Sequence, residues 1–179
     1  MRLAQGIKLS VALLLSVFLA SCASSSIRQS HVVTLNPNTP ILVVPFYNNS
    51  DTPNAGQRAG SLLLGLLAAK GMRNVQLYRV ASRCENPLTC GTTTIAWKSI
   101  QSWASANQIH YVFMGDVNEW RYKVGLDGEP SVGVMINLKD VDTGRTLWTA
   151  VGSQVGHSWS GLSNTAQQLF QKLLITIQR

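Results

Sequence analysis

Three histidines and three cysteines are the residues of this chain best suited to nucleophilic, redox or metal chemistry. His31, His110 and His157 lie far apart in the sequence, and none belongs to a motif that sets a base, a nucleophile or a second metal ligand at a catalytic spacing. Glycine-rich patterns that bind phosphates or nucleotides are also absent from the sequence. We therefore predict no catalytic residue, no metal site and no cofactor, and expect that the chain is not an enzyme.

Cys22 stands directly behind a short apolar run, residues 9–20, which two basic residues precede. This arrangement is typical of a secretory signal, and the run is shorter than the ~20 residues that span a bilayer. The sequence LASC that ends at Cys22 resembles the bacterial lipobox, after which the cysteine is acylated; an ordinary signal peptide with an incidental cysteine is the alternative. We predict a lipoprotein signal peptide over 1–21, a lipid on Cys22, and a flexible tether over 22–30, because that segment is small and polar.

Cys84 and Cys90 enclose the segment ENPLT, in which Asn86 and Pro87 favour a turn. An exported chain enters an oxidising compartment where such a pair closes, whereas zinc would require further ligands nearby and a redox pair is usually C-x-x-C. We predict a structural disulfide between Cys84 and Cys90.

Charged residues make up only 13% of the chain, about half the usual ~25%, although the net charge is +7. A basic chain suggests nucleic acid as a partner, but no cluster of Lys and Arg stands out, so we predict no nucleic-acid partner. The scarcity of charge suggests surfaces that are buried against partners or lipid.

Hydrophobic periodicity predicts strands and helices in alternation over residues 31–179, which we expect to form a single domain. Strands are predicted at 41–46, 75–80, 109–124, 132–141 and 145–155, and helices after Thr52-Pro53, near 96–104 and over 162–177 with Asn164 as its cap. Gly71 is expected at a helix C-terminus and Gly144 in a tight hairpin. The order β-α-β-α-β-β-β-α predicts an α/β fold with a single mixed β-sheet and helices packed mainly on one face.

Six of the eight carboxylates fall between residues 116 and 142, so this segment is acidic in a basic chain. Asp140 and Asp142 fit a solvated hairpin end. Asp116, Glu119, Asp127 and Glu129 fit either solvated turns or an acidic face that attracts a cationic ligand.

Trp148 is predicted on the outer face of the sheet. Period-2 alternation groups Leu147, Val151 and Val155 on one side of their strand, taken as the core side, and Trp148 then points the other way. An outward indole requires a covering helix, a subunit contact or a membrane interface, and all three remain open.

Three blocks of the chain carry a resemblance to a known family: ILVVPFYNNSDTPNAGQRAGSLLLGLLAAKG, MGDVNEWRYKVGLDGEPSVGVMINLKDVDTGRTLWTA and GHSWSGLSNTAQQLFQKLL. The chain resembles the PelC family of outer-membrane lipoproteins of the Pel exopolysaccharide export system. The resemblance implies a homo-oligomeric ring, a dodecamer in that family, on the periplasmic side of the outer membrane beneath the porin PelB. It also implies an electronegative opening for a cationic exopolysaccharide, with Asp116, Glu119, Asp127 and Glu129 as candidate lining residues, and Trp148 as a candidate membrane-facing or interface residue.

A second hypothesis is a monomeric outer-membrane lipoprotein that regulates cell-envelope synthesis by binding a protein. Such a regulator requires a long tether to cross the periplasm. The predicted tether of about eight residues reaches only some 25–30 Å when extended, which favours the export accessory.

Overall fold

The computed structural model describes residues 24–79, 96–125 and 128–179, and the predicted signal peptide, Cys22, the predicted disulfide between Cys84 and Cys90, and Asp127 lie outside them. The elements are β1 Ser25–Gln29, β2 Val33–Thr34, β3 Ile41–Val43, β4 Tyr47–Asn48, α2 Ala55–Ala69, β5 Val75–Leu77, α3 Trp97–Ala106, β6 Tyr111–Tyr122, β7 Pro130–Asp140, β8 Thr146–Val155, α4 Leu162–Leu173 and β9 Ile177–Gln178. The α/β fold with one main mixed sheet is confirmed, and β1, β2, β4 and β9 are additional to the predicted order.

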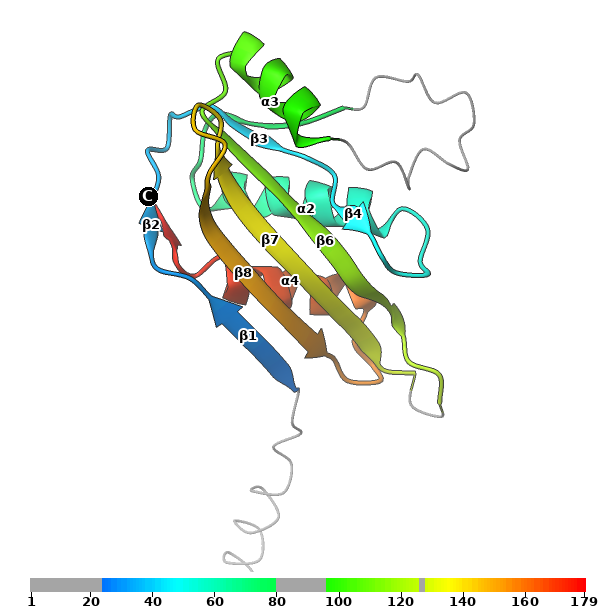
Figure 1. The fold of residues 1–179 in the computed structure, drawn as a ribbon. Helices are drawn as coiled ribbons and strands as arrows, with labels where there is room; N and C mark the ends of the chain where they lie inside the picture. Colours follow the sequence, from blue (N-terminus) through cyan, green and yellow to red (C-terminus); the bar gives the residue numbers. More distant parts are fainter. Residues whose placement is uncertain (1–23, 80–95, 126–127) are drawn as a thin grey trace, which may run out of the picture.

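The main sheet has the strand order β1-β8-β7-β6-β3-β5 (Figure 1). β6, β7 and β8 form an antiparallel meander, and Gly144, which has a φ of +69°, lies in the predicted hairpin between β7 and β8. β3 and β4 pair with successive parts of β6, because Pro45 between them has no N–H to continue the ladder. The strand predicted over 41–46 therefore ends at Val43, and β4 follows beyond the predicted range.

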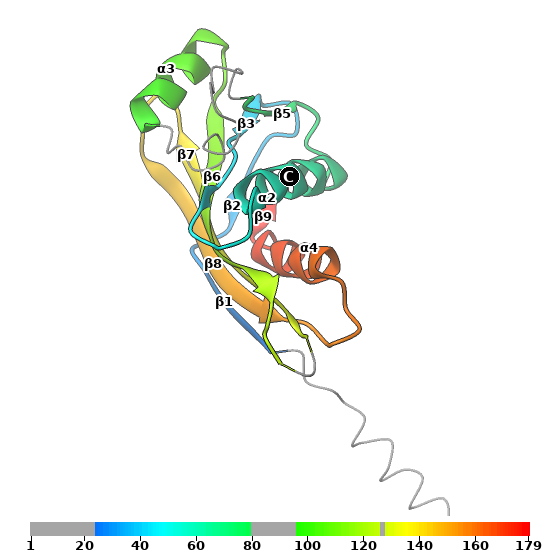
Figure 2. The same ribbon diagram turned by 90° about the vertical axis from the view of Figure 1, so that its right-hand side faces the viewer.

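Helices α2 and α4 lie side by side on one face of the sheet, and α3 packs on the opposite face near one end (Figure 2). Under α2 and α4 the core contains Phe113, Ile136 and Phe170, all completely buried. Under α3 a smaller cluster joins Ile100 and Ala104 to strand residues. The prediction of helices mainly on one face is confirmed.

The N-caps predicted at Thr52 and Asn164 are wrong. α2 begins at Ala55 after Asn54, because the Thr52 hydroxyl donates instead to the carbonyl of Trp120 on β6. α4 begins at Leu162 as predicted, but its N-cap is Gly161 and not Asn164, and its first N–H, that of Leu162, donates to the Tyr122 hydroxyl at 3.0 Å. It ends at Leu173, so Ile177, predicted in the same helix, lies instead in β9. In both cases a residue of β6, distant in sequence, makes the hydrogen bond: Trp120 accepts from the Thr52 hydroxyl, and Tyr122 accepts from the first N–H of α4. Gly71, with a φ of +93°, follows the end of α2 as predicted.

The segment predicted as a flexible tether is largely a strand. Residues 25–29 form β1, which pairs antiparallel with β8 over five residue pairs. β8 would otherwise expose a row of backbone N–H and C=O groups, and β1 satisfies them. The Gln29 side-chain amide also donates to the carbonyls of Lys172 and Leu173 at the end of α4, at 2.6 and 2.9 Å. These contacts fix a segment whose small polar composition suggested a linker.

Trp148 is a core residue, and the predicted outward orientation is wrong. It is 1% exposed, its indole N–H donates to the Thr176 hydroxyl at 2.9 Å, and its ring meets Phe113 edge-on with centroids 6.3 Å apart. It lies directly opposite Leu138, so the two share the core face. The apolar Val151 is instead 42% exposed on the outer face. Trp148 is therefore neither a membrane-facing nor an interface residue.

The core face of β8 carries small residues because α4 crosses it. A Cβ at Gly152 would lie 2.8 Å from the Ser26 carbonyl oxygen, 3.1 Å from Leu173 and 3.2 Å from Leu169. Beyond Gly152, the buried Gln154 side chain donates to Gln168 at 2.8 Å. A strand with glycine and glutamine facing the core does not show the apolar alternation by which a core face is recognised.

We expect Gly152→Ala to destabilise the fold by about 1–3 kcal/mol, because its methyl group overpacks the contact between β8, β1 and α4. Gly133→Ala on β7 is the matched control, since a Cβ there has ordinary contacts at 3.4 Å and beyond; its effect should stay within about 0.5 kcal/mol. Urea unfolding of both variants at one protein concentration measures the difference. Equal midpoints would contradict this account of the core face.

Candidate functional site

The face of the sheet opposite α2 and α4 is covered by α3 only at one end, and a groove of about 610 Å³ opens on the remainder. Strands β1, β6, β7 and β8 form its floor, and the loop after β4 forms one wall. The side chains that determine its character are Arg28, Asp51, Glu119, Arg121 and Ser153. The groove is thus polar, with charges of both signs.

The groove forms where β6 has a bulge at Asn118 and where β7 has a glycine, Gly133. The pairing of β6 with β7 shifts between Val117 and Glu119, leaving Asn118 as an extra residue, and such a bulge bends a strand. Gly133 lies opposite Glu119. The loop after β4 is attached at the bulge: the Asn49 N–H donates to the Val117 carbonyl at 2.8 Å, and the Asn49 amide donates to Asn118 at 3.2 Å.

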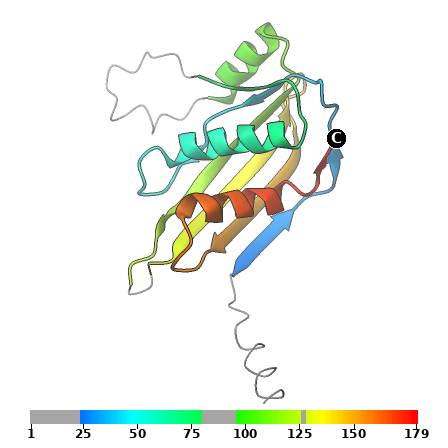
Figure 3. The ribbon, with the colours of Figure 1, turned by 180° about the vertical axis from the view of Figure 1, so that it is seen from behind.

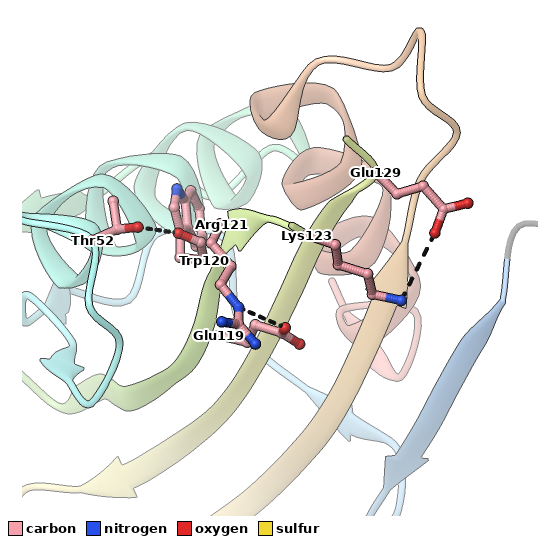
Figure 4. A network of polar contacts seen from close by, with 6 residues as sticks. All are labelled: Thr52, Glu119, Trp120, Arg121, Lys123 and Glu129. Carbon is pink, nitrogen blue, oxygen red and sulfur yellow. Dashed lines mark hydrogen bonds and ion pairs between the residues drawn. The ribbon is translucent and has the colours of Figure 1, made fainter. Parts of the chain in front are cut away.

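Ion pairs offset part of the acidic charge around the groove (Figure 4). The Arg121 guanidinium donates through Nε to the Glu119 carboxylate at 3.2 Å. At the end of the β6–β7 hairpin, Lys123 lies 3.8 Å from Glu129. Both pairs are substantially exposed to solvent, so they contribute little to stability. Their main effect is to fix where the charges lie.

Asp116 lies on the same outer face, between Tyr47 on β4 and Met135 on β7. Among the described residues no cation lies within ion-pair distance of its carboxylate. Partial burial raises the pKa of Asp116 above its ordinary value, because removal from water disfavours the charged form. Asp140 is the opposite case: hydrogen bonds from the Thr143 hydroxyl and N–H, both 2.7 Å, lower the pKa of its carboxyl.

No family model and no curated protein matches this chain. Among solved structures, it is similar to the PelC dodecamer from Paraburkholderia phytofirmans, with 34% identity over 86% of this chain and 96% of that one, and a TM-score of 0.73. The chain belongs to the PelC family. A point variant of the same dodecamer in another crystal form matches equally well, at 34% identity and a TM-score of 0.73 with 97% of that chain covered.

A lipoprotein from Neisseria meningitidis shares the fold beyond the PelC family, at 21% identity and a TM-score of 0.50 over 76% of this chain and 94% of that one. At this identity the likeness concerns the fold alone. For the function of the present chain, the PelC dodecamers are the informative neighbours.

Of the four carboxylates predicted to line an opening, Asp127 lies outside the described residues, and two of the other three share one face of the sheet. Asp116 and Glu119 lie on the same outer face of β6, whereas Glu129 lies at the hairpin end beside Lys123. The pattern of the sequence did not single out Arg28 and Asp51, which join the groove from β1 and from the loop after β4. Arg28 was assigned to the tether, and Asp51 lay in the loop before the predicted helix, with no role assigned to it.

Within the described residues of this PelC-family chain, no three or more His, Cys, Asp or Glu side chains are grouped so that they could hold a metal ion. No described helix is long and apolar enough to cross a membrane. His157 stacks on Trp159 with centroids 5.0 Å apart, in the loop between β8 and α4. The groove itself presents charged and hydrogen-bonding side chains, among them Arg28, Asp51 and Glu119.

The two aspartates should affect stability with opposite signs. Because the raised pKa of Asp116 means that the folded state holds its proton more tightly, stability falls as pH rises through the ordinary carboxyl pKa of about 4. Asp116→Asn should therefore raise the melting temperature at pH 7, and the difference should vanish below pH 4. Asp140→Asn should lower the melting temperature at pH 7, because the charged carboxylate stabilises the fold only above its ordinary pKa. Thermal unfolding at both pH values checks both, and a parallel response of the two variants would refute this assignment.

Proposed function

We propose that this PelC-family chain is an outer-membrane lipoprotein that assembles into a ring on the periplasmic side and assists export of a cationic exopolysaccharide through the porin PelB. The observation that carries the proposal is the similarity to the PelC dodecamer over 86% of the chain. The role is non-catalytic: the ring positions and attracts the polymer.

The position of β1 supports attachment through Cys22. β1 begins at Ser25, so an acylated Cys22 holds the adjacent end of the sheet close to the lipid. The same end carries the β6–β7 hairpin and the loop between β8 and α4 (Figures 1 and 2). It exposes Tyr122, Val124 and Trp159, at 51%, 100% and 78%. Exposed aromatic and apolar side chains of this kind favour the boundary between lipid and water.

Trp159 thus takes the membrane-facing role that the sequence had suggested for Trp148. Its indole is held against His157 in a loop beside the hairpin, and it projects from the end where the chain leaves for the lipid. An amphipathic indole at that position adds affinity to the acyl anchor without inserting a helix.

The outer face of β6 supports the electrostatic part of the proposal. Asp116 and Glu119 are presented on one strand, and Asp51 lines the same groove as Glu119. Repetition of these carboxylates around a ring would create a negative field that concentrates a cationic polymer. Screening beyond ~8 Å at physiological ionic strength makes the effect depend on several carboxylates acting together.

The test is export by variants with neutralised carboxylates. Asp116→Asn alone should reduce secreted polymer mildly, and Asp116→Asn with Glu119→Gln should reduce it several-fold, because the double change also leaves Arg121 without its carboxylate. The measurements are secreted polymer and the size of the assembly in mild detergent. The matched control is Glu129→Gln with Asp142→Asn, which changes net charge equally but in the connections before and after β7.

Normal export by the double variant in an intact ring would refute guidance by these carboxylates while leaving the ring in place. A wild-type protein that stays monomeric at high concentration in mild detergent would refute the ring itself.

The membrane-facing role of Trp159 predicts a specific fluorescence result. In vesicles that contain brominated lipid, the tryptophan emission of the acylated protein should be quenched, and Trp159→Phe should remove most of that quenching. Trp103→Phe is the control, since Trp103 is 37% exposed but lies on α3 at the other end of the molecule. Quenching that persists in Trp159→Phe would contradict the proposed orientation.

A further inference from the structure

Positive and negative side chains are separated along this chain. All carboxylate side chains of the described residues lie on the loop after β4 and in residues 116–142. No Asp or Glu occurs in residues 52–79 or 143–179, although the first of these segments has four Lys or Arg side chains and the second has three. These two segments include α2, β5, β8, α4 and β9. The molecule therefore has a purely cationic part, which attraction of a cationic polymer does not explain.

Three of these cations lie at the edge of the molecule where both helices end. α2 and α4 end side by side, next to the small sheet of β2 and β9 (Figure 3). Lys70 is the C-cap of α2, Arg73 lies three residues further on, and Arg179 directly follows β9. Two apolar side chains just before β2 and β9 are also exposed, Val32 at 53% and Ile175 at 68%. We call these five residues the helix-end edge.

The Arg179 side chain packs on the glycine that separates the other two cations in sequence. A Cβ at Gly71 would lie only 2.3 Å from the Arg179 Nη1 atom, so the guanidinium occupies the space that a side chain at position 71 would fill. This contact brings Arg179 beside the backbone segment that carries Lys70 and Arg73. Like charges gathered in this way repel one another, and an anion bound among them would offset the repulsion.

The fold itself does not require these cations. The last carbonyls of α2 already accept from the backbone N–H groups of Lys70, Gly71 and Met72, at 2.9, 2.9 and 3.1 Å, so no side chain is required to cap the helix. Neither ion pair of the described residues includes a cation of the helix-end edge. The terminal carboxylate of Arg179 offsets at most one of the three charges. The edge therefore has positive charge available for a partner.

The composition of the helix-end edge fits a protein partner. Two of its three cations are arginines, whose planar guanidinium can donate two parallel hydrogen bonds to one carboxylate. Arginine beside exposed apolar side chains is typical of protein interfaces, where complementary charge selects the partner.

The position of the edge disfavours lipid headgroups as the partner. β1 begins three residues after Cys22 and is about 17 Å long, and it runs from the end proposed to face the lipid toward β2 and this edge (Figure 1). A cationic polymer would be repelled by the same charges. An acidic protein segment is the partner that fits both the charge and the position.

We propose that the helix-end edge docks an acidic segment of a partner protein in the periplasm. The compartment rests on the proposed function, but the contact does not require the ring. Carboxylates of the partner pair with Arg73 and Arg179, and its apolar side chains cover Val32 and Ile175. The carboxylates of β6 remain free for the polymer, because they lie on another surface of the chain.

The test uses a fluorescent oligoglutamate peptide as the probe and the full chain in mild detergent. Fluorescence anisotropy should show binding that weakens as salt is raised, because salt screens exposed charges. Arg73→Gln with Arg179→Gln should weaken binding about tenfold. The matched control, Arg58→Gln with Lys98→Gln, removes two exposed cations elsewhere and should change the affinity by less than about twofold. Melting temperatures should stay at the wild-type value, since all four side chains are exposed.

Each contrary outcome has a distinct meaning. An equal loss of affinity in the two variants would show a response to net charge alone and would overturn the proposal. Displacement of the peptide by a soluble short-chain phosphatidylglycerol would assign the edge to lipid headgroups and overturn it as well. Loss of the ring in the Arg73 and Arg179 variant would make the edge a subunit contact, which is a third result against it. A wild-type protein that is monomeric but binds the peptide at this edge would refute the ring of the proposed function and leave the docking surface standing.

Discussion

The register between β7 and β8 is the constraint on which the rest of the molecule depends. It sets Leu138 opposite Trp148, Ile136 opposite Ala150 and Val134 opposite Gly152, so the core face of β8 changes from a large side chain at one end to small residues in the middle of the strand. α4 fits into the space that the small residues leave. A slip of one residue would turn Trp148 to water and bring Val151 against α4. The same register therefore determines the core, the position of α4 and the residues of β7 and β8 that lie on the outer face of the sheet.

Much of the fold is predictable from the sequence, because each major element has a strong period. The helix that contains Leu63 and Leu67, the hairpin at Gly144 and the long strands of the meander are where periodicity indicates. The orientation of β8 was not predictable, since its core face carries glycine and a buried glutamine that α4 satisfies. β1 was not predictable either, because a short polar segment forms a strand only where it can pair with the edge of a sheet, here β8. The predicted N-caps of α2 and α4 were wrong for the same reason, because the hydrogen bonds at these helix ends are made with β6, which is distant in sequence.

The candidate site was predictable in part. Asp116 and Glu119 are close in sequence, and they share a face only because of the bulge at Asn118: without it, residues 116 and 119 would point to opposite sides of β6. Arg28 and Asp51 come from segments whose position depends on pairing with β8 and β6, so no local pattern marked them. A site on an uncovered sheet face gathers side chains from strands that are far apart along the chain, and sequence spacing alone does not assemble it.

The antiparallel pairing of β1 with β8 also has a mechanical consequence. Tension applied to the N-terminus along the strand axis would load the β1–β8 backbone hydrogen bonds in shear, so that the five residue pairs resist together instead of opening one by one. At the C-terminal end of β1, the Gln29 amide adds two hydrogen bonds to the carbonyls of Lys172 and Leu173, the last two residues of α4. A pull that reaches β1 from the N-terminal side would thus pass into the sheet and the helix layer as one body.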